Sequence, residues 1–291
     1  MKTKATLIAI AVIGMLASSC QEEEISFGQY TGTQRLSRAY YYYTYHQITS
    51  DKRTGRALMD TTYQTSEYPF KQFEWNGNLP TSFTQYDDDG IYFTTDYTYD
   101  GTQLSILKDT YDDGVVTMKF HYTKGKLATA TSGRNMYFAE YDDAGRIVQI
   151  TINHADGSAL DAKGSTRQVI TYGYEGENVT KLVQTSYMED NITEQTTSTY
   201  TYDSKKSPYK DIFDSWDSPL CFSANNIVEK TVATSGDNAT TVTTHYTYTY
   251  TGDYPSTVYY AETYNTVDGN YLIDIERFFT TRFEYLPAAT E

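Results

Sequence analysis

The sequence lacks the short motifs by which common catalytic sites are recognised. It contains no His-Glu-x-x-His, no Gly-x-Ser-x-Gly, no Gly-x-x-x-x-Gly-Lys and no cysteine pair for zinc. Its histidines, His46, His121, His154 and His245, are scattered along the chain and are typical of solvent-facing strand positions. We therefore expect no catalytic residue, no metal and no cofactor.

Basic charge is also scarce, with 23 lysines and arginines against 38 acidic residues and a net charge of −15. Nucleic acids and anionic lipids bind basic faces, so both are excluded as partners. Acidic pairs such as Asp142-Asp143 fit hairpin turns better than a glycosidase pair. The run Asp87-Asp88-Asp89-Gly90 lacks the alternating ligand spacing of a calcium loop.

Helical patterning is missing beyond the first residues of the chain. No later window has apolar residues at a spacing of about 3.6 residues over several turns. Leucine is scarce, whereas 31 tyrosines and many threonines favour strands. The composition therefore predicts an all-β fold with very little helix.

What the sequence does have is a tyrosine-rich repeat, made of an aromatic-x-aromatic triplet, a turn with glycine and an apolar residue. The clearest copy runs from Tyr97 to Leu104, and others begin at Phe73, Phe120, Tyr172 and Tyr248. Alternation within these segments places aromatic rings on a buried face and threonines on a wet face. Asp-Gly and Asn-Gly turns alternate between the two ends, which indicates an up-and-down antiparallel meander.

We assign residues 36–291 to a single domain of about 16 strands. A sheet of that width does not stay flat, so we expect a strongly curled sheet or a closed barrel. Residues 204–226 interrupt the repeat and contain Pro208 and Pro219, which do not fit paired strands.

The N-terminus has the pattern of an export signal over residues 1–19, with Lys2 and Lys4 before an apolar stretch too short to span a bilayer. Leu16-Ala17-Ser18-Ser19-Cys20 resembles a bacterial lipobox, which implies cleavage before Cys20 and a diacylglycerol on its sulfur. Residues 20–35 form an expected tether, and Gln21-Glu22-Glu23-Glu24 resembles the surface-export tag of Bacteroides-type lipoproteins. The resemblance implies a lipid-anchored outer-membrane protein exposed at the cell surface.

Removal of residues 1–19 takes away two lysines and changes the net charge from −15 to −17. With Cys20 lipidated, Cys221 has no partner for an internal disulfide. Stability must then come from the core and the sheet, and we expect Cys221 to be a small buried side chain.

Two further resemblances concern the repeat. Tyr141-Asp142-Asp143-Ala144-Gly145-Arg146 is similar to the YD repeat of Rhs and teneurin proteins, whose hairpins form one spiralling sheet. The lipobox, the Tyr-x-Tyr hairpins, the break from Ser207 to Ile227 and Tyr254-Pro255 together resemble a Bacteroides-type lipoprotein family of unknown function. That resemblance implies a porin-like fold and a cell-envelope location, and no activity.

A membrane pore is nevertheless disfavoured. A barrel in lipid carries an apolar outer band with aromatics confined to girdles, whereas tyrosine here runs through the strand centres. The chain also ends in a polar tail after Phe283-Glu284-Tyr285. We expect a lipid-tethered β-domain that stands in water.

The interrupting loop is the first candidate for a binding site. Tyr209, Phe213 and Trp216, with Trp75 from the repeat, offer rings on which the C-H faces of sugars stack. The alternative is that Phe213, Trp216 and Phe222 plug the concave side of the sheet.

We predict a non-enzymatic protein that binds an extracellular glycan or host polymer. A structural subunit of an envelope complex is the alternative, followed by a glycoside hydrolase or a pore. The sequence does not fix the oligomeric state.

Overall fold

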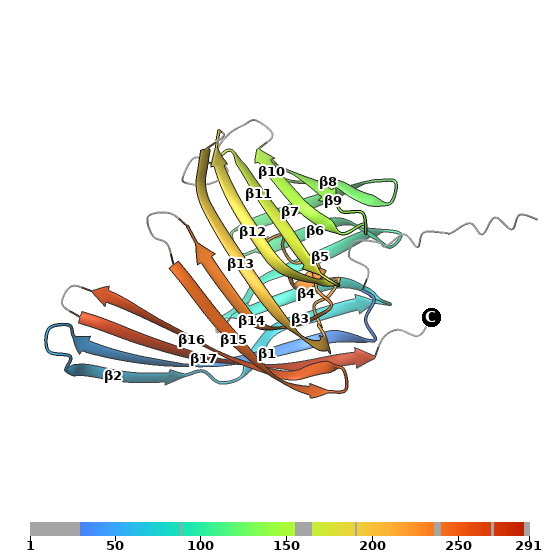
Figure 1. Cartoon of the computed structure of the whole chain (residues 1–291). Coiled ribbons are helices and arrows are strands. Elements are labelled where there is room, and N and C mark those ends of the chain that lie inside the picture. The colour runs from blue at the N-terminus through green and yellow to red at the C-terminus, as the bar shows by residue number, and fades with distance from the viewer. Residues whose placement is uncertain are drawn as a thin grey trace, which may run out of the picture.

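The structure is a computed structural model that describes residues 30–87, 89–154, 165–189, 191–235, 240–268 and 271–287. Within these ranges it contains 17 strands and a short 3-10 helix (Figure 1). The strands are β1 Gln34–Asp51, β2 Ala57–Gln64, β3 Tyr68–Asn76, β4 Leu79–Asp87, β5 Gly90–Asp100, β6 Gln103–Tyr111, β7 Gly114–Thr123, β8 Lys126–Ser132, β9 Asn135–Tyr141, β10 Ile147–His154, β11 Arg167–Glu175, β12 Asn178–Met188, β13 Asn191–Lys206, β14 Asn225–Thr234, β15 Thr240–Thr251, β16 Tyr254–Asp268 and β17 Tyr271–Pro287. The helix η1 spans Leu220–Phe222. In the described ranges no helix has the length and apolar content needed to cross a bilayer.

The strands form one antiparallel sheet that closes on itself. From β3 to β17 each strand pairs with the next along the chain, which is the up-and-down order. One edge of β1 pairs with β17, and its other edge pairs with β3 at residues 38–41 and with β2 at residues 44–50. Because β2 and β3 share one position beside β1, the closed ring is a 16-strand barrel.

Part of the sheet projects beyond the ring. The β15–β16 ladder stops at Tyr246 opposite Tyr260, whereas β16 and β17 stay paired as far as Asp268 opposite Tyr271. The distal parts of β2, β1, β17 and β16, in that order, form a projection at the lower left of Figure 1. We call this projection, residues 44–51, 57–64, 261–268 and 271–278, the tongue.

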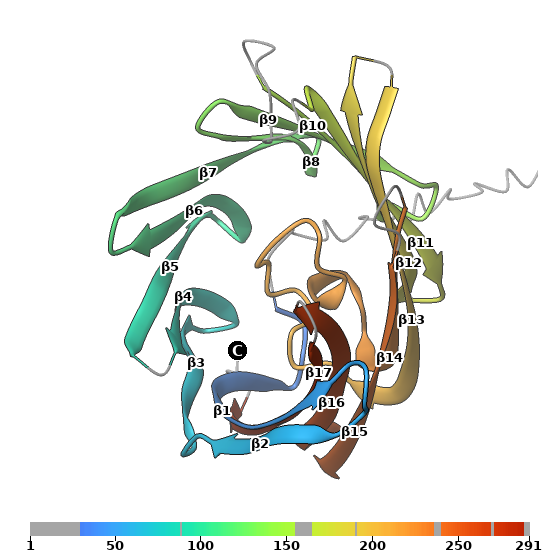
Figure 2. The same cartoon turned by 90° about the vertical axis from the view of Figure 1, so that its left-hand side faces the viewer.

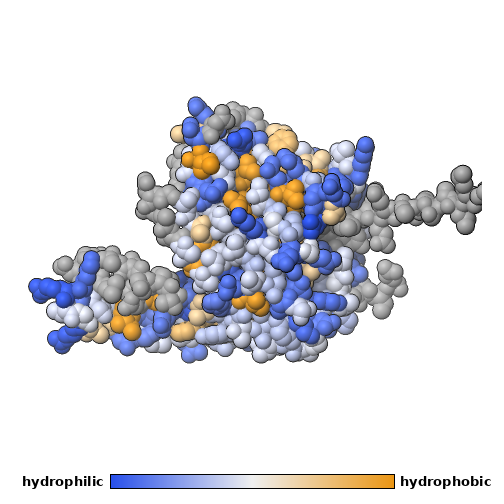
Figure 3. All heavy atoms as spheres, in the orientation of Figure 1, coloured by the Kyte–Doolittle hydropathy of each residue, from blue (hydrophilic) through white to orange (hydrophobic). Residues whose placement is uncertain are grey.

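The inner and outer faces of the barrel differ in composition. Inward positions are buried and apolar or aromatic, including Phe73, Phe83, Tyr97, Leu107, Phe120, Ile150, Ile170, Tyr172 and Tyr200. The exposed outward positions include apolar side chains such as Phe138 and Tyr259. They also include the charged or polar side chains of Asp96, Lys108, Lys119, His121, Glu140, Lys181 and His245. Figure 3 shows one face of this surface, on which apolar residues are scattered among hydrophilic ones. Among the described residues, polar and apolar side chains are therefore mixed on the outer face, whereas a wall that contacts lipid carries an apolar band.

The tyrosine repeat builds a row of hydrogen bonds along one rim of the barrel. Tyrosines near strand ends, and one tryptophan, donate to a backbone carbonyl on the preceding strand of the ring. The Tyr122 hydroxyl lies 2.7 Å from the carbonyl oxygen of Leu104, and the Tyr174 hydroxyl lies 2.9 Å from that of Ile147. The same bond joins Tyr141 to Leu127, Tyr202 to Val179, Tyr248 to Ile227, Tyr285 to Pro255 and, through an indole N–H, Trp75 to Leu36. We call these contacts the rim bonds.

Each rim bond stands where two paired strands separate. The β6–β7 ladder ends at Ile106 opposite Lys119, so the carbonyl of Leu104 has no partner in that ladder, although Leu104 is fully buried. A buried carbonyl without a partner costs free energy of about 1–3 kcal/mol. The tyrosine hydroxyl supplies that partner, and hairpin turns close the strand pairs in between. Turns and rim bonds therefore alternate around this rim.

The fold expected from the sequence is confirmed. The protein is all-β, its strands run up and down, and of the two expected shapes the closed barrel is the one observed. The turn glycines Gly77, Gly101 and Gly176 have φ values of 58°, 61° and 58°, in the region that Asn-Gly and Asp-Gly hairpin turns require. On β7, Phe120 is buried while Lys119 and His121 are exposed, as the alternation predicts.

Both described ends of the chain lie at the rim that carries the rim bonds. Gln34 pairs with Pro287 across β1 and β17. Tyr30 is buried, and its ring meets that of Trp75 edge-on at 5.2 Å. Residues 30–35, which the sequence placed in the tether, are thus packed on the barrel or part of β1. Residues 1–29, with the expected signal segment and Cys20, lie outside the described ranges.

We predict that Tyr122→Phe lowers the free energy of unfolding by about 1 kcal/mol, because it leaves the Leu104 carbonyl without its donor and keeps the ring. Urea unfolding at constant m-value measures the change. Tyr259→Phe is the matched control, because this tyrosine is 44% exposed on the outer face. Equal stability of the two variants would show that the rim bonds contribute nothing.

Candidate functional site

The loop between β13 and β14 folds into the lumen of the barrel. Figure 2, viewed along the barrel, shows it surrounded by strands that are far from it in sequence. Its backbone is held by bonds of its own, from the Asp211 amide to the Cys221 carbonyl at 3.0 Å and from the Ile212 amide to the Tyr209 carbonyl at 3.1 Å. Lumenal tyrosines of the wall hold it from outside: the Tyr97 hydroxyl donates to the Phe213 carbonyl at 2.9 Å, and Tyr172 donates to the Trp216 carbonyl.

Two of the predicted ligand-binding residues are buried inside this plug. Phe213 and Trp216 are 2% and 5% exposed, and their rings meet edge-on at 4.6 Å. Phe120 packs against Phe213 at 5.6 Å, and Tyr137 packs against Trp216 at 6.0 Å. These two side chains occupy the positions that the plug alternative predicts, and a ligand would reach them only by displacing the loop.

Trp75 lies apart from the loop residues. Its indole N–H donates to the Leu36 carbonyl at 2.8 Å as one of the rim bonds, and its ring contacts Tyr30. The structure therefore does not bring Trp75 together with Tyr209, Phe213 and Trp216 in a single site.

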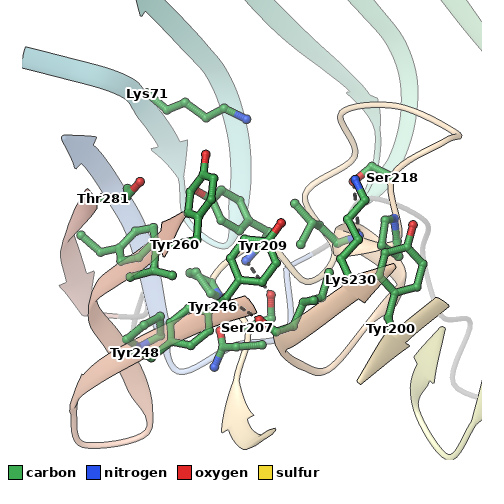
Figure 4. A pocket seen from close by; sticks show the side chains of 18 of the residues that line it. Lys71, Tyr200, Ser207, Tyr209, Ser218, Lys230, Tyr246, Tyr248, Tyr260 and Thr281 are labelled. Carbon is green, nitrogen blue, oxygen red and sulfur yellow. Dashed lines mark hydrogen bonds between the residues drawn. The ribbon is translucent and has the colours of Figure 1, made fainter. Parts of the chain in front are cut away.

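Tyr209 lines a partly open cavity of about 370 Å³ between the plug and the barrel wall (Figure 4). The wall side comes from β3, β13, β14, β15, β16 and β17, and the plug side from residues 207–209 and 217–220. Rings dominate the lining, which includes Phe70, Tyr200, Tyr209, Tyr246, Tyr248, Tyr260 and Phe283. The volume falls within the range of small-molecule sites, about 300–1,000 Å³.

A row of rings leads from the cavity onto the tongue. Tyr246 and Tyr260 line the cavity with centroids 5.1 Å apart, and Tyr260 stacks on Phe279 at 4.6 Å. The further contacts are Phe279 to Tyr41 at 5.8 Å, Phe279 to Tyr43 at 6.2 Å and Tyr43 to Tyr63 at 6.1 Å. We call Tyr246, Tyr260, Phe279, Tyr41, Tyr43 and Tyr63 the aromatic row.

The aromatic row lies on the inner face of the sheet and becomes more exposed toward the tongue. Tyr41 pairs with Thr281 and Tyr43 with Phe279 across β1 and β17, so these residues share the lumenal face. Exposure rises from 8% at Phe279 to 52% at Tyr63. Burial, with Glu262 nearby, raises the pKa of Tyr246 to about 12, so its hydroxyl is protonated and can donate near neutral pH.

Titratable groups of the plug are shifted by their burial. Burial raises the pKa of the Asp214 carboxyl, and the charge of Lys71 opposes that change. Burial also raises the pKa of the Cys221 thiol well above its ordinary value, with further contributions from Asp214 and Asp211. The thiolate is the reactive form of cysteine. Cys221 is therefore the small buried side chain that the sequence predicts.

Sequence reasoning found one lining residue of the cavity, Tyr209, and missed most of the others. The tyrosines of residues 40–45 stand out in the sequence, but their neighbours Phe279 and Tyr260 follow from the pairing of β1 with β17, which closes the barrel. Lys71 and Lys230 carry no local signal, because each lies in an ordinary strand segment.

Comparisons with known proteins found similar solved structures and no similar family. No family model matches the chain, and no curated protein matches it. A porin-like protein from Bacteroides uniformis ATCC 8492 is 14% identical with a TM-score of 0.46, over 84% of this chain and 97% of that chain. A porin-like protein from Bacteroides vulgatus ATCC 8482 is 11% identical with a TM-score of 0.44, over 87% and 99% of the two chains. The similarity of residues 141–146 to YD repeats stays a prediction.

We predict that Tyr97→Phe loosens the plug, because the Phe213 carbonyl loses its donor. The rate at which a thiol reagent modifies Cys221 reports this opening, measured in a Cys20→Ser background that leaves one thiol. The native protein should react far more slowly than urea-unfolded protein, and Tyr97→Phe should react several-fold faster than native. Tyr259→Phe serves as the control. A native rate equal to the unfolded rate would contradict the buried placement of Cys221.

Proposed function

We propose that this protein is a non-enzymatic lipoprotein of the outer membrane that binds an extracellular glycan along the aromatic row. The observation that carries the proposal is the continuity of the row from the cavity to the exposed tongue. Sugar rings present apolar C-H faces that stack on aromatic side chains, while hydroxyls at the ring edges need hydrogen-bond partners. Tyrosine supplies both a ring and a hydroxyl, and five of the six members of the row are tyrosines.

The shape of the site favours one end of a polymer over its middle. The cavity is closed on one side by the plug, whereas the tongue extends the row into solvent. A glycan chain bound there would place its terminal sugars in the cavity and the following sugars along the tongue. Tyr209, the predicted site residue that lines the cavity, would contact the terminal sugars.

The number of carboxylates near the rings fits a protein that binds a glycan without hydrolysing it. Glycosidases use a pair of carboxyl groups that flank the scissile bond. Among the described residues that line the cavity, Asp217 carries a carboxylate and no second one faces it. The polar outer face and the plugged lumen likewise favour a tethered binding domain over a conducting pore.

We predict that Tyr63→Ala weakens glycan binding about 2- to 10-fold by removing one stacking ring. A glycan array probed with the mature protein identifies ligands, and titration of the best ligand measures the affinity of each variant. Because the Tyr63 side chain is exposed, we expect the variant to fold, and thermal unfolding checks this.

Tyr259→Ala provides the matched control. Tyr259 stacks on Phe278 at 6.4 Å on the outer face of β16 and β17, whose inner face carries Tyr260 and Phe279. Binding that is unchanged by Tyr63→Ala and by Tyr43→Ala would exclude the aromatic row. Failure of the mature protein to bind any glycan would refute the proposed function.

The membrane location is tested separately through Cys20. We predict that Cys20→Ser moves the protein from the outer-membrane fraction to an unanchored or unprocessed form, because no thioether to diacylglycerol can form. Cys221→Ser is the control and should remain in the membrane fraction. Retention of Cys20→Ser in the outer membrane would contradict lipid anchoring.

A further inference from the structure

Two lysines line the cavity. Lys71 enters from β3 and Lys230 from β14, on different sides of Tyr209 (Figure 4). In the part of the chain that the structure describes, neither ammonium group lies within 4 Å of a carboxylate. Elsewhere, Lys205 lies 3.5 Å from Asp253 and Lys210 lies 3.9 Å from Glu177.

Lys71 is held in place by aromatic rings. Its Nζ lies 5.7 Å from the ring centre of Phe70, 5.5 Å from that of Phe83 and 5.5 Å from that of Tyr209. Such contacts orient an ammonium group and leave its N–H donors free for a ligand. Burial lowers the pKa of Lys71, and the more distant Asp214 only partly opposes that change. An anion in the cavity would compensate the cost of burying this charge.

Lys230 provides the second charge from the neighbouring part of the wall. It stands opposite Tyr200 in the β13–β14 ladder, and both residues line the cavity. Ser218 of the plug lies beside it in Figure 4. The cavity therefore offers ammonium groups from two separate strands together with stacking rings between them.

The charged side chains around the cavity indicate which ligand charge would suit it. Lys71 and Lys230 contribute two positive charges to the lining and Asp217 contributes one negative charge, and Asp214 acts on Lys71 from outside the lining. The whole chain, by contrast, has a net charge of −15. A monoanionic group fits this balance better than a dianion, which would add repulsion from Asp217.

We propose that the cavity selects an acidic sugar, with its carboxylate between Lys71 and Lys230 and its ring against Tyr209 and Tyr246. This inference rests on the proposed glycan binding and specifies the chemistry of the terminal residue. The ammonium groups donate charge-assisted hydrogen bonds to the carboxylate, and the aromatic walls contact the C-H face of the ring.

The test compares each acid with its own methyl ester, which removes the charge and keeps the ring. The probes are oligosaccharides that end in glucuronate, galacturonate or N-acetylneuraminate, titrated into the mature protein by calorimetry. We expect at least one acid to bind about 10-fold or more tightly than its ester. Lys71→Met and Lys230→Met should each reduce the affinity for the acid toward that of the ester. Lys119→Met, on the exposed outer face, is the matched control.

The outcomes separate this inference from the proposed function. If acids and esters bind equally well and Tyr63→Ala weakens both, the glycan site stands and the selection of acidic sugars is wrong. Tighter binding of a sulfated sugar than of every carboxylate would also overturn the assignment. If no oligosaccharide binds, both proposals fail. Should Lys71→Met not fold, Lys71→Gln replaces it, and the comparison of acid with ester on the unaltered protein remains decisive.

Discussion

The hydrogen bond from a repeat tyrosine to a carbonyl of the preceding strand is the contact on which the barrel depends. It occurs where a ladder stops, as at Leu104 beyond Ile106 opposite Lys119. Strands at this rim can therefore separate without leaving buried carbonyls unpaired. One residue type accomplishes this because a tyrosine side chain combines a long apolar ring with a hydroxyl at its end. Repetition of this contact around the rim accounts for part of the abundance of tyrosine in the sequence.

Other tyrosines on the inner face contact the plug or line the cavity. Tyr97 and Tyr172 use their hydroxyls on the plug, while Tyr246 lines the cavity beside it. The strands thus form the barrel wall, whereas the size of the loop of residues 207–224 determines how much of the lumen is filled. Replacement of loop residues would alter the cavity with little effect on the rim bonds. In such an architecture, stability and recognition depend on separate sets of residues.

Local patterns predicted the barrel well, because alternation, turn glycines and the triplet are all encoded within about ten residues of each other. The site was less accessible to sequence reasoning. Tyr209 could be predicted because it lies in a break of the repeat, and it lines the cavity. Trp75 lies apart from the cavity, because its indole N–H bonds to a carbonyl of β1 that is distant in sequence. Lys71 and Lys230 lie about 160 residues apart in the sequence. They line the same cavity only because the sheet closes into a barrel. Contacts of that kind follow from topology, which no short window of sequence contains.

The position of the two chain ends gives the barrel a direction. Gln34 and Pro287 pair at the rim of turns and rim bonds, while β1 runs from there to the tongue. Any attachment through the residues before Tyr30 would hold the molecule at that rim. The tongue would then point away from the supporting surface, with Tyr63, the exposed member of the aromatic row, at its outer part.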